Sequence, residues 1–121
     1  MTTPRQALGQ RGEALAASHM ESQGWTVVAR NVRTPYGEID LIARDGATLV
    51  FIEVKTRRSK AYGRPEESVT ALKQSHLRNA TQTYVQDMRP MPEWRIDVMA
   101  LALGRDGSIV NLEHIRSAVG E

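Results

Sequence analysis

The sequence predicts a single domain of the α/β or α+β class, spanning residues 1–121. Its 121 residues are the length of one compact domain. Hydrophobic residues make up 40% of the chain and charged residues 25%, so one core can form. The chain has no cysteine that could form a disulfide or bind zinc as a thiolate. The succession of helical and strand patterns gives the element order α-β-β-β-α-β-β.

The first helix is expected over residues 5–23. Leu8 and Met20 lie near the two ends of an approximate apolar stripe, and Gly24 is a natural stop for the helix. Residues 25–30 are rich in side chains that favour strands, and they predict the first strand. We therefore expect the chain to pass from the first helix almost directly into the sheet.

The next two strands are expected to form a hairpin over residues 38–43 and 48–55. Asp45-Gly46 lies between them and is a strong short-range turn signal. A two-residue turn there pairs Arg44 with Ala47, and a four-residue loop gives the same register. A bulged three-residue loop would shift the register by one residue and turn the side chains of one strand to the other face.

The second half of the chain supplies one more helix and two more strands. Either Ser68 or Thr70 is a suitable N-cap for a helix that runs to about Gln86. Residues 94–101 predict a fourth strand, and residues 108–112 predict a fifth after a glycine-rich turn.

One face of the predicted hairpin collects acidic residues and a lysine. Side chains alternate between the faces of a strand, so Glu38, Asp40, Glu53 and Lys55 share one face. The opposite face is apolar and carries Ile39, Leu41, Val50, Ile52 and Val54.

In this register Asp40 and Glu53 are diagonal neighbours, with backbones roughly 7–8 Å apart. Two carboxylates at that separation can share one hard cation such as Mg²⁺. Lys55 can then orient a water molecule or stabilise negative charge that develops on a phosphodiester. Glu38 lies opposite Glu53 in this register and is a candidate for an accessory ligand or for a group that orients one.

A second interpretation of the same pattern is an exposed hairpin face with ordinary Glu–Lys pairs across the strands. Ile42, Leu49 and Phe51 also fall on that face, so it is not uniformly polar. Acidic side chains beside apolar ones favour a cleft over an open surface.

Basic residues follow the acidic pair closely. The formal net charge is +2, which by itself identifies no partner. The basic run at the end of the hairpin predicts either a solvated surface or a contact with a nucleic-acid backbone. Its members beyond Lys55 are Arg57, Arg58, Lys60 and Arg64.

Nothing in the sequence predicts a membrane segment. No apolar stretch approaches the roughly 20 residues that a membrane helix needs. The first residues lack the apolar core of a secretory signal, and a cytoplasmic protein is therefore expected.

The hairpin resembles the PD-(D/E)XK nuclease signature in Gly-Glu-Ile-Asp-Leu-Ile, residues 37–42, and in Phe-Ile-Glu-Val-Lys-Thr-Arg, residues 51–57. From Gly12-Glu13 to His114-Ile115 the chain is similar to the bacterial YraN-like family of predicted endonucleases. That family is itself similar to archaeal Holliday junction resolvases. The proline often found before the aspartate is absent, and Ile39 stands in its place.

The resemblance implies a restriction-endonuclease-like three-layer α/β fold, with a central mixed sheet flanked by helices. It implies Asp40 and Glu53 as ligands of Mg²⁺ or Mn²⁺ and Lys55 as the catalytic lysine. A glutamate on the first helix joins the site in resolvase-like proteins, and Glu13 occupies that place. Related nucleases also bring polar residues of a later helix near the metal, which makes Gln74 a further candidate.

Two residues outside these motifs complete the predictions. Lys73 precedes Gln74 on the expected second helix and is a candidate contact for nucleic acid, although a solvated helix face also fits it. Asp97 alternates with apolar neighbours on the fourth strand, which is typical of a structural acid on a sheet face.

The sequence thus predicts a Mg²⁺- or Mn²⁺-dependent endonuclease that acts on DNA. Branched or flapped DNA and a homodimer are expected only by analogy with the resolvases. Two other classes stay open: a nuclease-like DNA-binding module with little or no activity, and an adaptor in a larger complex. An RNA substrate also fits the sequence.

Overall fold

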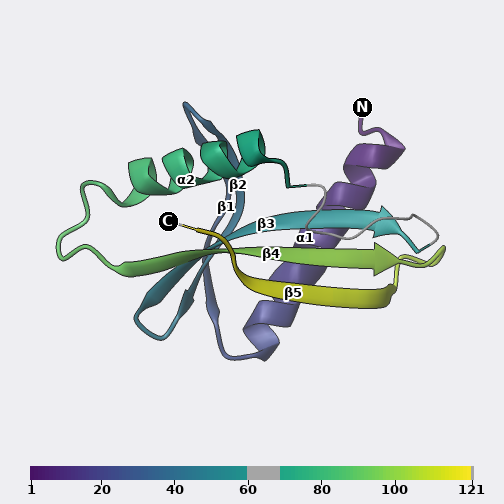
Figure 1. Cartoon of the computed structure of the whole chain (residues 1–121). Helices are drawn as coiled ribbons and strands as arrows, with labels where there is room; N and C mark the ends of the chain where they lie inside the picture. Colours follow the sequence, from purple (N-terminus) through teal and green to yellow (C-terminus); the bar gives the residue numbers. More distant parts are fainter. Residues whose placement is uncertain (60–68, 121) are drawn as a thin grey trace.

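The computed structural model describes residues 1–59 and 69–120, which form a mixed five-stranded sheet with one helix on each face (Figure 1). The strands lie in the order β1-β2-β3-β4-β5, and only β3 and β4 are parallel. The predicted order α-β-β-β-α-β-β and the three-layer α/β arrangement are confirmed. The elements are α1 (Pro4–Ser22), β1 (Thr26–Thr34), β2 (Gly37–Asp45), β3 (Thr48–Arg58), α2 (Ala71–Val85), β4 (Glu93–Leu103) and β5 (Ile109–Val119).

Local signals explain where the helices begin. α1 starts with a capping box in which the Thr3 side chain accepts a hydrogen bond from the Gln6 backbone and the Gln6 side chain accepts one from Thr3. The Thr70 side chain caps α2 by accepting from the Lys73 backbone N–H. Of the two predicted caps, the structure therefore uses Thr70, while Ser68 lies outside the described residues. Neither described helix is long and apolar enough to cross a membrane.

All five strands run further than the sequence predicted, and the largest extensions are in three of them. β1 continues to Thr34, β3 to Arg58 and β5 to Val119. The added segments are rich in polar or exposed residues, so they lack the apolar alternation by which a strand is recognised. Backbone pairing with the neighbouring strands holds them in the sheet instead.

The hairpin turn lies one residue later than predicted. Asp45 pairs with Thr48, so the two turn residues are Gly46 and Ala47. Gly46 has a φ of 60°, and a glycine at the first position of a two-residue turn suits the twist of the flanking strands. This correction moves the register by two residues, so the predicted faces are kept where β2 and β3 are paired, while each residue gains a different partner.

The ladder between β2 and β3 ends early. Its last pair is Leu41 with Ile52, whereas β2 stays paired with β1 as far as Gly37. Ile39 was predicted to share a face with Leu41, but it packs in the core beneath α2 instead. The change of face coincides with the end of the β2–β3 pairing, so the sheet opens where Asp40 and Glu53 lie.

A core fills each side of the sheet. Buried α1 residues pack against side chains of β2, β3 and β4, and the main members are Ala16, Ala17, Met20, Leu41, Val50, Ile52, Met99 and Leu101. The second core lies between α2 and the other face, and its main members are Ile42, Leu49, Phe51, Leu77, Ala80, Ile96 and Val98. At Gly12 a Cβ atom would come within 1.8 Å of Thr56 Oγ1, so glycine allows α1 to lie close to β3. This close approach brings the next residue, Glu13, toward the opening in the sheet.

Candidate active site

Asp40 and Glu53 meet where β2 separates from β3. Asp40 Oδ2 accepts a hydrogen bond of 2.8 Å from the Val54 backbone N–H, which replaces a strand-to-strand bond of the interrupted ladder. The Glu53 side chain is buried, with 4% of the residue exposed. Glu53 Oε2 has no hydrogen-bond partner among the described residues. A buried oxygen of this kind is costly unless a proton or a cation satisfies it.

The electrostatics of Asp40 show how strongly this opening resists negative charge. Burial is the main cause, and the nearby charge of Glu53 the second, of a rise in the pKa of Asp40 from its ordinary value of 3.8 to about 7. The Val54 N–H and the Lys73 ammonium act in the opposite direction but only partly offset these effects. Near neutral pH Asp40 therefore holds a proton part of the time, unless another positive charge lies beside it.

Two lysines approach Glu53 from different elements. Lys55 Nζ of β3 lies 3.4 Å from Glu53 Oε1, and Lys73 Nζ of α2 lies 3.6 Å from the same oxygen. The structure thus brings Lys73, predicted only as a contact for nucleic acid, directly beside the acidic pair. Because Glu53 itself is buried, the alternative of an open Glu–Lys surface face does not describe this site.

A second acidic pair borders the opening. Glu13 of α1 and Glu38 of β2 share the side-chain amide of Asn31: with its nitrogen facing them, Nδ2 donates to Glu13 Oε1 at 2.9 Å and to Glu38 Oε1 at 3.0 Å. Burial raises the pKa of Glu13, and the charge of Glu38 raises it further. Arg33 Nε is 3.9 Å from Glu38 at the exposed edge of this pair.

Asn31 is the residue of this site that the sequence reasoning missed. Its φ of 51° lies in the left-handed region, which Asn tolerates better than most residues. Asn is also disfavoured in strands, and yet it lies inside β1. A polar residue out of place in a strand pattern was the one available signal, and it does not reveal that the side chain would join two glutamates.

Gln74 does not join the cluster. Its amide nitrogen donates to the Val69 carbonyl at 3.0 Å, so the side chain supports the beginning of α2. Lys73 and Gln74 are consecutive, and a helix turns about 100° per residue, so the two side chains leave α2 in different directions. The sequence places Lys73 and Gln74 on one helix, but it does not determine how that helix is rotated against the sheet.

The basic run extends away from the site along β3. Arg57 and Arg58 are the last two residues of β3, and Arg58 Nη1 donates to the Gly104 carbonyl at 3.2 Å. Arg58 therefore points toward the β4–β5 turn. Lys60 and Arg64 lie outside the described residues, so their predicted contacts with nucleic acid stay predictions.

The metal predictions rest on Asp40 and Glu53. Within residues 1–59 and 69–120, no group of three His, Cys, Asp or Glu side chains is placed to hold a metal ion. Glu13 influences both carboxylates electrostatically, but its role as a third ligand stays a prediction. The arrangement described here offers a cation two carboxylates, one of which has a buried oxygen without a partner.

A different polar cluster surrounds Asp97 on β4. Asp97 is fully buried and accepts hydrogen bonds from Arg95 Nε at 3.1 Å and from the Ser117 N–H at 2.9 Å. His114 Nε2 lies 2.7 Å from its second oxygen. Trp25 covers this cluster, with its ring centroid 5.5 Å from that of His114 and 5.3 Å from the Arg95 guanidinium. The prediction of a structural acid describes Asp97 well, because donors surround its carboxylate.

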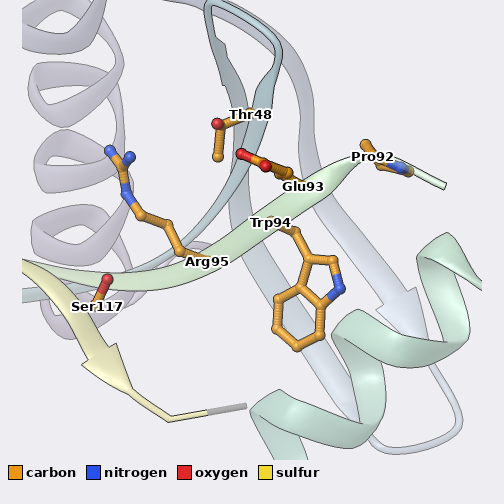
Figure 2. Close-up of a pocket in the computed structure, with 6 residues that line it drawn as sticks. All are labelled: Thr48, Pro92, Glu93, Trp94, Arg95 and Ser117. Carbon is orange, nitrogen blue, oxygen red and sulfur yellow. The ribbon is translucent and has the colours of Figure 1, made fainter.

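A pocket of about 530 Å³ adjoins this second cluster (Figure 2). Arg95 and Trp94 leave β4 in opposite directions there, and Ser117 of β5 lies near the base of Arg95. Arg95 also lies 3.5 Å from Asp45. Arg95 of this pocket thus already pairs with Asp45 and Asp97, and neither Asp40 nor Glu53 lines the pocket.

Comparisons with known proteins identify relatives but no activity. Residues 12–101 match the family described as uncharacterised protein family UPF0102, and this range includes Glu13, Asp40, Glu53, Lys55 and Lys73. A UPF0102 protein of Chloroflexus aurantiacus is 43% identical over 100% of this chain and 99% of its own length. One from Beutenbergia cavernae is 47% identical over 93% of this chain and 95% of its own. One from Symbiobacterium thermophilum is 46% identical over 84% and 87%.

Proposed function

The chain belongs to the uncharacterised protein family UPF0102, and from that premise we propose that it is a metal-dependent endonuclease that hydrolyses phosphodiester bonds in DNA. One observation carries the proposal. At the opening between β2 and β3, a buried glutamate with an unpartnered oxygen lies near an aspartate whose pKa is raised to about 7. The resemblance of the same hairpin to the PD-(D/E)XK signature supports this choice among the reactions that such a pair can serve.

The residues at the opening fit a hard divalent cation. Asp40 and Glu53 would hold it, since Mg²⁺ is commonly bound by one or two carboxylates and keeps several waters. The unpartnered Glu53 Oε2 and the raised pKa of Asp40 are both features that a cation would relieve. When bound, Mg²⁺ or Mn²⁺ supplies Lewis acidity toward the phosphoryl oxygens and makes water a better nucleophile.

The chain's own cations account for the rest of the chemistry. Water adds to phosphorus and loses a proton, the phosphorus–oxygen bond to the leaving group breaks, and the leaving oxygen gains a proton. Negative charge accumulates on the phosphoryl oxygens during this step. Lys55 and Lys73 both carry an ammonium group at the site and can turn from Glu53 toward that charge. Glu13, Asn31 and Glu38 form a hydrogen-bonded rim on the other side of the pair.

One observation favours a second candidate, a DNA-binding module without useful activity. Both lysines lie near Glu53 Oε1, so the site already contains positive charge without a metal ion. A protein that used this arrangement only to bind would attract the phosphate backbone through its lysines and arginines. It would show salt-dependent DNA binding with or without a chelator and would cut nothing.

A cleavage assay separates the two candidates. Linear, flap and four-way-junction DNA of matched sequence are incubated with the protein in Mg²⁺, Mn²⁺ or EDTA. We expect metal-dependent cutting that falls at least about 100-fold in Asp40→Asn and in Lys55→Ala. Glu113→Gln is the matched control, because Glu113 is an exposed acid on β5 outside the site. Cutting that persists in both site variants contradicts the proposed site, and binding without cutting in either metal supports the module.

A further inference from the structure

A pocket lined by three arginines lies at the far end of β3 from Asp40 and Glu53. Its volume is about 370 Å³, and its arginines come from α1, from the end of β3 and from the β4–β5 turn: Arg11, Arg58 and Arg105. A neighbouring pocket of about 290 Å³ shares Arg58 and Arg105 and continues to Ser59. In Figure 1 the amino-terminal half of α1, the end of β3 and the β4–β5 turn lie together at one end of the sheet.

The charges around this pocket are strongly unequal. All three arginines are exposed, and Asp106 is the acidic residue that lines the pocket with them. Asp106 Oδ1 accepts hydrogen bonds from the Ser108 backbone N–H at 3.0 Å and from the Ser108 hydroxyl at 2.7 Å. Those bonds lower the pKa of Asp106, so its carboxylate stays charged and is engaged within its own turn. Three guanidinium groups therefore face one carboxylate that already has its partners.

Two of the arginines are held in place by hydrogen bonds and still have N–H groups that can bind a ligand. Arg11 Nε donates to the Gly107 carbonyl at 3.3 Å, and Arg58 Nη1 donates to the Gly104 carbonyl at 3.2 Å. A guanidinium has five N–H groups, and each of these bonds employs one of them. The turn thus orients two guanidiniums at the pocket, while each retains further donors for a planar anion. α1 also has no acidic residue in its first turn, which leaves its positive end uncompensated beside the pocket.

The pocket and the candidate active site lie at different places along β3. Arg58 is five residues beyond Glu53, about 17 Å at a rise of about 3.3 Å per residue. Because this separation is odd, Arg58 lies on the α1 side of β3, whereas Glu53 lies on the side of Lys73 and α2. Lys55 and Arg57 lie between the two places on the same strand.

We propose that the pocket formed by Arg11, Arg58 and Arg105 binds a backbone phosphate of DNA. The identity of the ligand rests on the proposed function, because DNA is the substrate proposed there. The binding itself requires no metal and no cleavage. Arg105 is the informative residue, since Arg11 and Arg58 also support the β4–β5 turn through their bonds to Gly107 and Gly104.

The test measures DNA binding in EDTA. Fluorescence anisotropy of a labelled 20-base-pair duplex is followed from about 50 to 300 mM NaCl for the wild type, Arg105→Gln, Arg105→Lys and Arg89→Gln. Arg89 is the matched control: it is an exposed arginine between α2 and β4 whose side chain bonds to Gln86 and Met88. Every Gln variant removes one positive charge, so only the place of the charge differs.

We expect Arg105→Gln to weaken binding about 3- to 10-fold at 150 mM salt and to lower the slope of log affinity against log salt by about one. Arg105→Lys should keep most of the slope, and Arg89→Gln should leave the slope unchanged. Equal slopes for Arg105→Gln and Arg89→Gln would overturn the proposal. So would saturable binding of inorganic phosphate at Arg105, seen by NMR at constant ionic strength, together with unchanged DNA binding in Arg105→Gln.

The two proposals can fail separately. If Arg105→Gln lowers the salt slope of DNA binding as expected while no DNA is cut in Mg²⁺ or Mn²⁺, the proposal of the phosphate pocket is supported and that of the nuclease activity is contradicted. If Asp40→Asn abolishes cutting while Arg105→Gln binds DNA like Arg89→Gln, the nuclease stands and the pocket does not.

Discussion

Neighbouring parallel strands carry two buried carboxylates whose surroundings differ completely. Glu53 on β3 is 4% exposed and Asp97 on β4 is 0% exposed. Glu53 pairs in register with Val98, and Asp97 pairs with Ile52, so the two acids are one step apart on opposite faces of the sheet. Both therefore pay a similar desolvation cost, and burial alone does not separate a structural acid from a functional one.

The difference lies in how completely each carboxylate is satisfied. The carboxylate oxygens of Asp97 lie 2.7 to 3.1 Å from Arg95 Nε, His114 Nε2 and the Ser117 backbone N–H. Glu53 has two lysines at 3.4 and 3.6 Å on one oxygen and no described partner on the other. A satisfied buried carboxylate holds β4 and β5 together, whereas an unsatisfied one leaves room for a further positive charge. The comparison predicts that the same kind of substitution changes stability greatly at Asp97 and little at Glu53.

The largest effect is expected for Asp97→Asn. The substitution keeps the side-chain volume but removes the buried negative charge that Arg95 and His114 share, and it leaves Arg95 paired with Asp45 at 3.5 Å. Removing one member of a buried, hydrogen-bonded ion pair typically costs about 3–5 kcal/mol. Urea unfolding at pH 7 measures the loss, with Glu113→Gln as the exposed control. A loss below about 1 kcal/mol would mean that the network around Asp97 contributes little, and the comparison would fail.

An intermediate effect is expected from Asp40 and from pH. Because its folded-state pKa is raised to about 7, the folded protein holds a proton that the unfolded chain releases above about pH 4. Folding stability should therefore fall as pH rises from about 4 to 7, and Glu13, with its raised pKa, acts in the same direction. Asp40→Asn should remove about 2 kcal/mol of this fall and be the more stable protein at pH 8 in EDTA.

Chemical unfolding at closely spaced pH values tests this expectation. The control is again Glu113→Gln, whose stability should follow the wild type across the range. A wild type that becomes more stable between pH 4 and 7, with Asp40→Asn unchanged, would contradict the raised pKa of Asp40 and with it the conclusion that this opening disfavours negative charge.

The smallest effect on stability is expected for Glu53→Gln. One oxygen has no described partner to lose, and both lysines are partly exposed and can return to water. The free energy of unfolding in EDTA should therefore change by less than about 1 kcal/mol. The pKa of Asp40 should fall, since the charge of Glu53 is one of the causes that raise it. NMR titration of the Asp40 carboxyl carbon measures this fall, and a loss of stability as large as that of Asp97→Asn would remove the distinction between the two acids.

Much of this fold could be predicted because its signals are local. Capping residues, turn residues and side-chain alternation gave the order of the elements, and alternation grouped Asp40, Glu53 and Lys55 on one face. The two-residue error in the hairpin register leaves the faces of the paired residues as predicted, because an even shift returns each of them to the same face, whereas Ile39 lies beyond the paired region and changed face. The lengths of β1 and β5 were harder, since pairing partners rather than apolar side chains hold their outer halves in the sheet.

By itself the sequence determined which residues of one hairpin share a face, because the two-residue period of a strand is a local property of the chain. Only the tertiary structure decided what surrounds each of them. The sheet opens at Asp40 because the β2–β3 ladder ends there. The rotation of α2 places Lys73, and not Gln74, beside Glu53. The left-handed backbone of Asn31 joined Glu13 to Glu38, and the donors of β4 and β5 satisfied Asp97 while leaving Glu53 unsatisfied. These outcomes depend on contacts between segments far apart in the chain, which no local period encodes.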